Sequence, residues 1–260
     1  MELKIFYSHY NTKNAVKKDR PDWFSFESCL VNLLDTIKES NSKIKIRLFL
    51  VFDGDEASFF DDFSSKYFDL KNQIVEGNLT KEVRLIKAGD AFVAAHQLLD
   101  MVFNEPTHSP DDLVYTLEND YLHVPGWLEC VEDLVNSDIN FHYLTLYDHA
   151  DKYRHTSSYN GKYDRLKSQI YVTPSRHWRT TPSTCFSLIS KAKFLQEDKL
   201  IYKNLRDQYV QPFLRLIRGR ILVSAIPGLS THCMSRYLSP LIDWHKISTK
   251  ASCCNVQNKS

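Results

Sequence analysis

Apolar and polar residues along the first half of the chain alternate between two periodicities. Short apolar runs with strand character occur at residues 3–7, 44–52, 83–86, 113–117 and 141–146. Apolar residues at helical spacing fill the intervals between these runs, at residues 26–37, 59–68, 91–103 and 127–135. This strand–helix rhythm predicts the α/β class, with a mostly parallel central sheet flanked by helices.

The second half of the chain is patterned less regularly. Residues 148–183 are polar and tyrosine-rich, and a long irregular segment inside a compact domain is often a lid or a binding loop. A strand, a helix that stops at Gly219 and a further strand are predicted after it, at residues 184–189, 205–217 and 221–225. Residues 251–260 are small and polar and predict a flexible tail. We therefore expect a single domain over residues 1–250.

Composition narrows the class of protein. The chain has 260 residues, 25% of them charged and 43% hydrophobic, as in an ordinary soluble globular protein. The formal net charge of +1 argues against a nucleic-acid-binding protein or one that coats an anionic membrane. No apolar run approaches the roughly eighteen residues of a transmembrane segment, and no signal peptide is recognisable. The six cysteines show no C-x-x-C spacing, which favours a reduced, cytoplasmic protein.

The most informative stretch is the acidic end of the strand predicted at residues 113–117. Glu118 and Asp120 follow this strand two residues apart, so on an extended chain both carboxylates point the same way. Hard oxygen donors of this kind suit Mg²⁺ or Mn²⁺ and, through the ion, a diphosphate. Ligands of open parallel sheets bind beyond the carboxyl ends of the strands, where Asp53 and Asp55 also lie. The alternative is an acidic strand-to-turn junction without a ligand.

Together these pieces resemble a nucleotide-sugar glycosyltransferase of the GT-A fold, over roughly residues 1–245. Glu118-Asn119-Asp120 is similar to the Asp-x-Asp metal motif of that family, with Glu in place of the first Asp. His232 matches the late histidine that many members contribute as a third metal ligand. Residues 227–232 and 239–244 are most similar to a little-studied group from bacteria and large viruses. The resemblance implies a nucleotide-binding half at about 1–120 and a smaller acceptor-binding half at 121–250.

The resemblance also implies positions that contact the donor. Asp53 closes the second strand, where such enzymes commonly contact the nucleoside, and Asn119 is the middle residue of the metal motif. Lys87 and Gly89 belong to a stretch that resembles the turn beside the donor. Tyr7 and His9 end the first strand, where a nucleoside base could stack, although a buried strand end explains them equally well.

Asp207 matches the general base of inverting members, because it begins the helix that carries this residue in the family. The family has an acidic pair there, whereas this chain has Arg206 before Asp207. The alternative for Asp207 is a carboxylate that stabilises the helix dipole. Asp148 and Asp164 are the next candidates for a base. Two further pairs of candidates each have two interpretations. Trp178 and Arg179 could contact a ligand or form a packing pair. His149 and His155 could be solvated side chains or ligands.

We therefore predict a metal-dependent hexosyl- or deoxyhexosyltransferase. It would transfer a sugar from a nucleoside diphosphate sugar, with UDP as the expected carrier, to a glycan or glycoprotein acceptor. Mn²⁺ or Mg²⁺ is the expected cofactor, and an imidazole ligand favours Mn²⁺. Two alternatives stay open. One is a nucleotidyltransferase acting on sugar phosphates, although residues 8–18 lack the glycines of a triphosphate loop. The other is a non-catalytic glycan-binding domain of the same fold.

Overall fold

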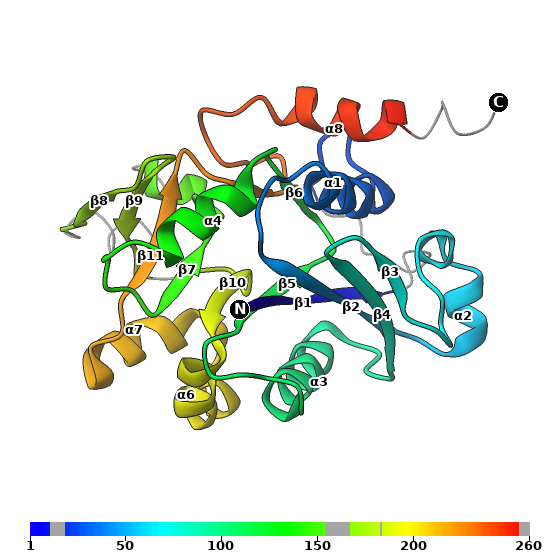
Figure 1. The fold of residues 1–260 in the computed structure, drawn as a ribbon, viewed down its shortest axis with the longest axis horizontal. Helices are drawn as coiled ribbons and strands as arrows, with labels where there is room; N and C mark the ends of the chain where they lie inside the picture. Colours follow the sequence, from blue (N-terminus) through cyan, green and yellow to red (C-terminus); the bar gives the residue numbers. More distant parts are fainter. Residues whose placement is uncertain (11–18, 154–166, 183, 255–260) are drawn as a thin grey trace. The chain divides into compact units, whose positions relative to one another are not determined.

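The computed structural model describes residues 1–10, 19–153, 167–182 and 184–254 (Figure 1). Within them the chain forms two compact units. Each unit is assembled from three separate segments of the chain. The first unit comprises Met1–Val16, Lys43–Asn119 and Cys185–Arg220, and the second comprises Lys17–Ser42, Asp120–Thr184 and Ile221–Ser260. The chain therefore passes from the first unit to the second inside the predicted metal motif, between Asn119 and Asp120.

The first unit is built on a mixed, mostly parallel sheet in the order β3-β4-β2-β1-β5-β10. The strands β4, β2, β1 and β5 pair in parallel, and β3 and β10 join the two ends of this series antiparallel. The strands are β1 (Glu2–Tyr10), β2 (Lys45–Asp53), β3 (Ile74–Glu76), β4 (Leu79–Ile86), β5 (Leu113–Glu118) and β10 (Leu188–Lys191). This sheet confirms the predicted α/β fold class, and it places the ends of β1, β2 and β5 at one edge.

Burial explains why the central strands read as apolar runs. Strands of a parallel sheet are covered on both faces, so they are hydrophobic nearly throughout. Phe6 of β1 stacks on Phe49 of β2, with ring centroids 4.7 Å apart. Lys4 is the polar exception on β1, and its ammonium lies 2.9 Å from the Asp112 carboxylate. A buried charge with such a partner avoids the cost of an isolated one.

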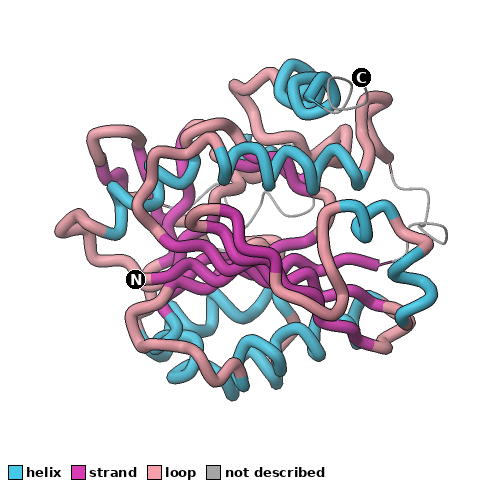
Figure 2. The backbone as a smooth tube through the Cα atoms, turned by 45° about the vertical axis from the view of Figure 1, so that its right-hand side comes forward, coloured by secondary structure: helices cyan, strands magenta, loops and turns pink. Residues whose placement is uncertain are grey.

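The helices α3 and α6 of the first unit pack on the same face of this sheet (Figure 2). The helical elements are α2 (Glu56–Phe60), the 3₁₀ turn η2 (Phe63–Lys66), α3 (Ala91–Asn104), α6 (Ala192–Asn204) and α7 (Asp207–Arg218). The single helix predicted at 59–68 is wrong, because Asp55 and Asp62 each begin a separate short element with a side-chain cap. The helix α6 was not predicted. Its apolar residues are sparse, and its buried Asp198 is held by Arg220 at 2.9 Å.

The second unit contains two small sets of strands. β6 and β12 form an antiparallel pair, and the other strands follow the order β7-β11-β9-β8. The strands are β6 (Tyr121–His123), β7 (Tyr143–Thr145), β8 (Ile170–Val172), β9 (His177–Thr180), β11 (Leu222–Ile226) and β12 (Ser230–His232). Residues 148–183, expected to be irregular, thus contain β8 and β9, and these are short enough to escape a periodicity analysis.

The second unit has four helical elements among its described residues. They are α1 (Phe26–Lys38), α4 (Trp127–Val135), the 3₁₀ turn η3 (Ala150–Tyr153) and α8 (Trp244–Cys254). Ser25 and Ser28 form a capping box on α1, and α1 lies beside α8 (Figure 1). Gly126, with φ of 80°, provides the left-handed turn that leads into α4. Across the described part of the chain, none of the helices has the length and apolar character that crossing a bilayer requires.

Candidate functional site

Asp120 and His232 meet because two short strands of the second unit pair around them. β6 and β12 are antiparallel, with His232 opposite Tyr121 and Ser230 opposite His123. The Cys233 amide donates to the Asp120 carbonyl at 2.8 Å, which extends the ladder beyond the strands. This pairing brings together two residues that are 112 positions apart in sequence.

The imidazole of His232 contacts the carboxylate of Asp120 directly. His232 Nε2 lies 3.0 Å from Asp120 Oδ2. The ring of His232 is held from two sides, since Tyr121 stacks on it at 5.1 Å and Tyr147 packs edge-on at 6.4 Å. The Asp120 side chain is almost completely buried, while His232 stays half-buried. A carboxylate and an imidazole held side by side supply two of the donor types that bind divalent cations.

Arg20 is a second partner of Asp120 in the same unit. Its guanidinium Nη2 lies 2.6 Å from Asp120 Oδ2, and Nη1 donates to the Cys233 carbonyl at 2.7 Å. The guanidinium carbon lies 4.5 Å from the centre of the Phe24 ring, which adds a cation–π contact. Burial alone would raise the pKa of the Asp120 carboxyl. The hydrogen bond and charge of His232, with the charge of Arg20, outweigh burial and lower that pKa to about 2.

Two buried thiols lie behind this cluster. Cys29 Sγ and Cys233 Sγ are 3.9 Å apart, and both side chains are inaccessible to solvent. Burial and the neighbouring Cys233 raise the pKa of the Cys29 thiol well above its usual value, so the thiol stays protonated. Cys29, Cys130 and Cys233 are free thiols and form no disulfide.

The first unit holds another histidine–aspartate pair, His9 and Asp62, at the end of β1. His9 is buried, with Nε2 3.0 Å from Asp62 Oδ1 and Nδ1 2.9 Å from the Asn119 amide nitrogen. The Tyr7 hydroxyl donates to the Asn119 carbonyl at 3.2 Å. The sequence therefore pointed to three residues, Tyr7, His9 and Asn119, that form one network. Their predicted contact with a nucleoside stays a prediction.

Asp53 organises the turn after β4. Its carboxylate accepts the backbone N–H of Ala88 at 2.7 Å and that of Gly89 at 3.1 Å. Gly89 has φ of 74°, a left-handed conformation that a residue with a side chain rarely adopts. Lys87, the remaining predicted donor residue, immediately precedes this turn. Asp53 and Gly89 are thus joined by a hydrogen bond, and Lys87 lies two positions before Gly89.

Two predicted site residues lie at places where the chain changes element. Glu118 is the half-buried last residue of β5 in the first unit, two positions before Asp120. Asp207 is the first residue of α7, as predicted, but its side chain lies outside the described residues. The alternatives Asp164 and His155 also lie outside them.

Asp148, the other candidate for a base, belongs to a separate cluster in the second unit. Its carboxylate accepts the Tyr153 hydroxyl and the Arg179 guanidinium, each at 2.5 Å. Burial and this hydrogen bond raise the pKa of Tyr153 to about 12. Trp178 is fully buried and its indole donates to Thr173 at 3.1 Å, so the packing interpretation of Trp178 is the correct one.

Sequence analysis missed several contributors to these clusters. Arg20, Asp62 and Tyr121 each touch a predicted residue, yet none of them lies in a motif. Tyr121 could have been found from its position next to Asp120 in a strand. Arg20 and Asp62 carry no such signal, because the contacts come from distant parts of the chain.

Comparisons with known proteins give a fold and no family. No protein family matches the chain, and no curated protein matches it in sequence. Solved structures do match. The UTP-bound UGPase from Acinetobacter baumannii is 13% identical with a TM-score of 0.51, and the alignment covers 98% of this chain and 93% of that one. A UDP-glucose pyrophosphorylase from the same organism is 11% identical with a TM-score of 0.50, covering 96% and 92%.

The chain shares the α/β fold of these pyrophosphorylases. A galactosyltransferase, LgtC, in complex with donor and acceptor sugar analogs, is 12% identical with a TM-score of 0.44, covering 85% of this chain and 72% of that one. The fold shared with the two Acinetobacter structures is the mixed, mostly parallel sheet flanked by helices described above.

Proposed function

We propose that this protein is a metal-dependent glycosyltransferase. It transfers a sugar from a nucleoside diphosphate sugar, with UDP as the carrier, to a hydroxyl group of a glycan. The observation that carries the proposal is the contact between His232 Nε2 and Asp120 Oδ2 at 3.0 Å. Two residues chosen from sequence for one metal site, 112 positions apart, are neighbours in the second unit.

The donor atoms suit a divalent cation. Glu118, Asp120 and His232 offer carboxylates and an imidazole, the donor types that hold Mn²⁺. The low pKa of Asp120 keeps its carboxylate charged at neutral pH, and the stacked Tyr121 ring fixes the orientation of His232. When bound, the cation would neutralise the charge that develops on the departing diphosphate. Within this proposal Glu118 is the third ligand, because only one residue separates it from Asp120.

Residues of the first unit would serve the nucleoside and the acceptor. Gly89 lies in the turn closed by Asp53, and Lys87, which precedes that turn, would offer its ammonium to the donor. Tyr7, His9 and Asn119 support the end of β1 from within a buried network. Asp207, at the start of α7, would accept the proton of the acceptor hydroxyl in an inverting transfer.

Ligand-induced stabilisation tests this proposal. A ligand bound only by the folded state raises the melting temperature. UDP with Mn²⁺ should therefore raise it in the wild-type protein, and the shift should disappear in the His232→Ala variant. Asp207→Asn should retain the shift and lose sugar transfer. A wild-type protein that shows no shift with any nucleoside diphosphate, with or without Mn²⁺, contradicts the proposal.

A nucleotidyltransferase acting on sugar phosphates is the second candidate. The observation that favours it is the pair of pyrophosphorylase structures with TM-scores of 0.51 and 0.50. The two activities differ in their products. With UTP and glucose 1-phosphate, a nucleotidyltransferase releases pyrophosphate. With a UDP-sugar and Mn²⁺, a glycosyltransferase releases UDP.

A further inference from the structure

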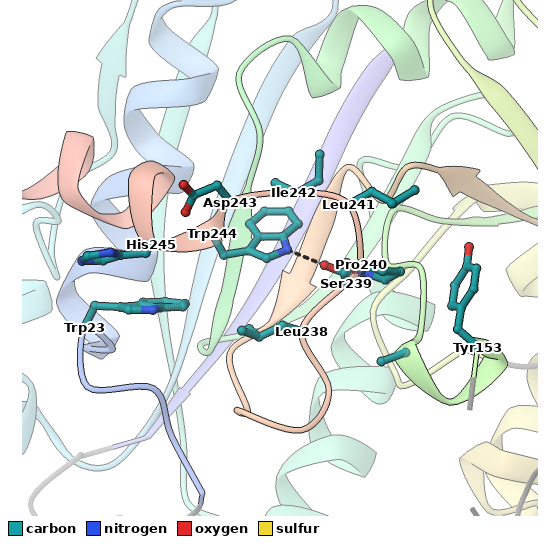
Figure 3. A pocket seen from close by; sticks show the side chains of 11 residues that line it. Trp23, Tyr153, Leu238, Ser239, Pro240, Leu241, Ile242, Asp243, Trp244 and His245 are labelled. Carbon is teal, nitrogen blue, oxygen red and sulfur yellow. Dashed lines mark hydrogen bonds between the residues drawn. The ribbon is translucent and has the colours of Figure 1, made fainter. Parts of the chain in front are cut away.

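The second unit contains a pocket that the proposed metal site does not use. Its volume is about 570 Å³, within the roughly 300–1,000 Å³ of small-molecule sites. The lining is formed by residues 238–245, together with Trp23 and the η3 residues Ala150 and Tyr153. Figure 3 shows Trp23 at one end of this lining and Tyr153 at the other, with the segment 238–245 between them.

The chemistry of the lining is aromatic and nearly uncharged. Trp23 and Tyr153 present rings to the pocket, and Leu238 and Leu241 add apolar surface. Among the described residues that line it, Asp243 is the one carboxylate, and there is no lysine or arginine. A phosphorylated ligand would meet the like charge of Asp243 and no lysine or arginine among these lining residues, which is unfavourable. Aromatic rings beside a few polar groups suit the apolar faces and hydroxyls of an uncharged sugar.

Strand β12 fixes one wall of the pocket. The Ser239 amide donates to Thr231 Oγ1 at 2.8 Å, and the Trp244 indole donates to the Ser239 carbonyl at 2.7 Å. Thr231 immediately precedes His232, so the wall is bonded to the strand that carries the proposed metal ligand. Leu241, which is 77% exposed, lies at this wall with φ of 70°. Its left-handed backbone holds an apolar side chain in solvent, a costly arrangement typical of functional sites.

The opposite wall is joined to the same site through aromatic contacts. Ala150 lines the pocket and directly follows His149, whose ring is 5.1 Å from that of Tyr147. Tyr147 in turn packs edge-on against His232. The Tyr147 hydroxyl donates at 2.5 Å to the carbonyl of Tyr237, which immediately precedes the lining residue Leu238. The contacting rings of His149, Tyr147 and His232 therefore connect the pocket with the Asp120–His232 pair.

We infer that this pocket binds an uncharged saccharide, with sugar rings packed on Trp23 and Tyr153, and that this saccharide is the acceptor. The role as acceptor rests on the proposed glycosyltransferase function, whereas saccharide binding does not. The lining also argues for an acceptor without phosphate, and so against a sugar phosphate as the ligand of this pocket.

Binding of simple glycosides to the full chain tests the inference. The probes are the methyl glycosides of glucose, galactose, mannose and N-acetylglucosamine, measured by saturation-transfer NMR. Glucose 1-phosphate serves as the charged counterpart. At least one glycoside should bind the wild-type protein, and Trp23→Ala should weaken it about tenfold, by the loss of one aromatic contact. Glucose 1-phosphate should not compete for the pocket.

Two further variants keep the test independent of folding defects. Leu241→Gly removes apolar surface from the wall and relieves the left-handed backbone, so it should weaken glycoside binding without lowering the melting temperature. Leu200→Ala is the matched control, because Leu200 is 74% exposed and does not line the pocket. It should bind glycosides as the wild type does.

The inference is overturned if no glycoside binds the wild type, or if Trp23→Ala and Leu241→Gly bind as tightly as Leu200→Ala. Competition by glucose 1-phosphate would overturn it as well. The thermal shift with UDP and Mn²⁺, measured on the same wild-type protein, separates this outcome from a failure of the proposed function. Glycoside binding without that thermal shift would support saccharide binding in this pocket and contradict the proposed glycosyltransferase function.

Discussion

Two histidine–aspartate pairs with the same separation lie in the two units and differ in their surroundings. In the first unit His9 Nε2 is 3.0 Å from Asp62, and in the second His232 Nε2 is 3.0 Å from Asp120. The His9 side chain is completely buried and its other ring nitrogen is hydrogen-bonded to Asn119, whereas the His232 side chain is 15% exposed. A buried histidine with both ring nitrogens hydrogen-bonded, such as His9, supports the end of a strand. A histidine that solvent can reach, such as His232, can also accept a ligand.

The charged neighbours sharpen this contrast. Asp120 contacts the guanidinium of Arg20 as well as the imidazole of His232, so two side chains hold its carboxylate. Asp62 instead accepts the Ser64 amide, in the manner of a helix cap. Under the proposed function the pair of the second unit would hold a cation, whereas the pair of the first unit fixes a backbone turn.

The largest effect is expected from Asp120→Asn. This change removes the negative charge that pairs with Arg20 and His232, and with it a proposed metal ligand. Mn²⁺-dependent transfer should fall by at least about a hundredfold, as when one electrostatic contact to a transition state is lost. Transfer assays with a UDP-sugar measure this. Asp111→Asn is the control, since Asp111 is a largely exposed carboxylate and its loss should leave transfer unchanged.

Asp62→Ala should act on stability and spare the metal site. It leaves His9 and the Ser64 amide, both buried, without their acceptor, which should cost about 3 kcal/mol of unfolding free energy. Urea denaturation gives this value. Asp61→Ala, at an exposed neighbouring position, should change stability by less than about 0.5 kcal/mol. Equal losses in the two variants would contradict a structural role for the His9 pair.

A third histidine extends the comparison to pH. Burial lowers the pKa of His123 to about 3, whereas in the unfolded chain it is about 6.5. The unfolded state therefore binds a proton that the folded state does not, and the stability contributed by the neutral ring is lost as the pH falls below about 6.5. Between about pH 6.5 and about pH 5 the loss should be about 2 kcal/mol.

Urea denaturation at several pH values measures this loss. His123→Gln cannot take up the proton and should show a correspondingly flatter dependence of stability on pH. If the unfolding free energy of this variant depends on pH as steeply as that of the wild type, His123 is not the source of the pH dependence.

The smallest effect is expected from Arg20→Gln. The guanidinium lies 2.6 Å from the Asp120 oxygen that also faces His232, so it repels and competes with a second cation. Its removal should tighten Mn²⁺ binding about fivefold, or about 1 kcal/mol. Isothermal titration with Mn²⁺ measures it. Arg236→Gln, at an exposed arginine of the same unit, should leave the affinity unchanged. Weaker Mn²⁺ binding in Arg20→Gln would show that Arg20 supports the site.

The elements that could be predicted from sequence are those with strong periodicity. The strands β1, β2 and β5 and the helices α3 and α4 follow the predicted ranges closely, because burial on both faces or on one stripe imposes a regular pattern. Short strands such as β8 and β9 carry too few residues for a period. The polar helix α6 lacks a clear apolar stripe, since part of its buried face is Asp198 held by arginines.

The same division applies to the candidate site. Asp120 and His232 could be chosen from motifs, and the pairing of β6 with β12 brings them together. Arg20 could not, because its contact with Asp120 joins residues 100 positions apart and has no local signature. His9 looked like a ligand contact from its place at a strand end. Only its bonds to Asp62 and Asn119 reveal the network that surrounds it.

Electron spin-echo spectroscopy of bound Mn²⁺ tests the central claim most directly, because it detects an imidazole nitrogen coordinated to the ion. With UDP and Mn²⁺ present, the wild-type protein and a His9→Gln variant should both show the nitrogen modulation, and His232→Ala should lose it. A modulation that survives in His232→Ala, or is absent from the wild type, would contradict a metal site built on Asp120 and His232.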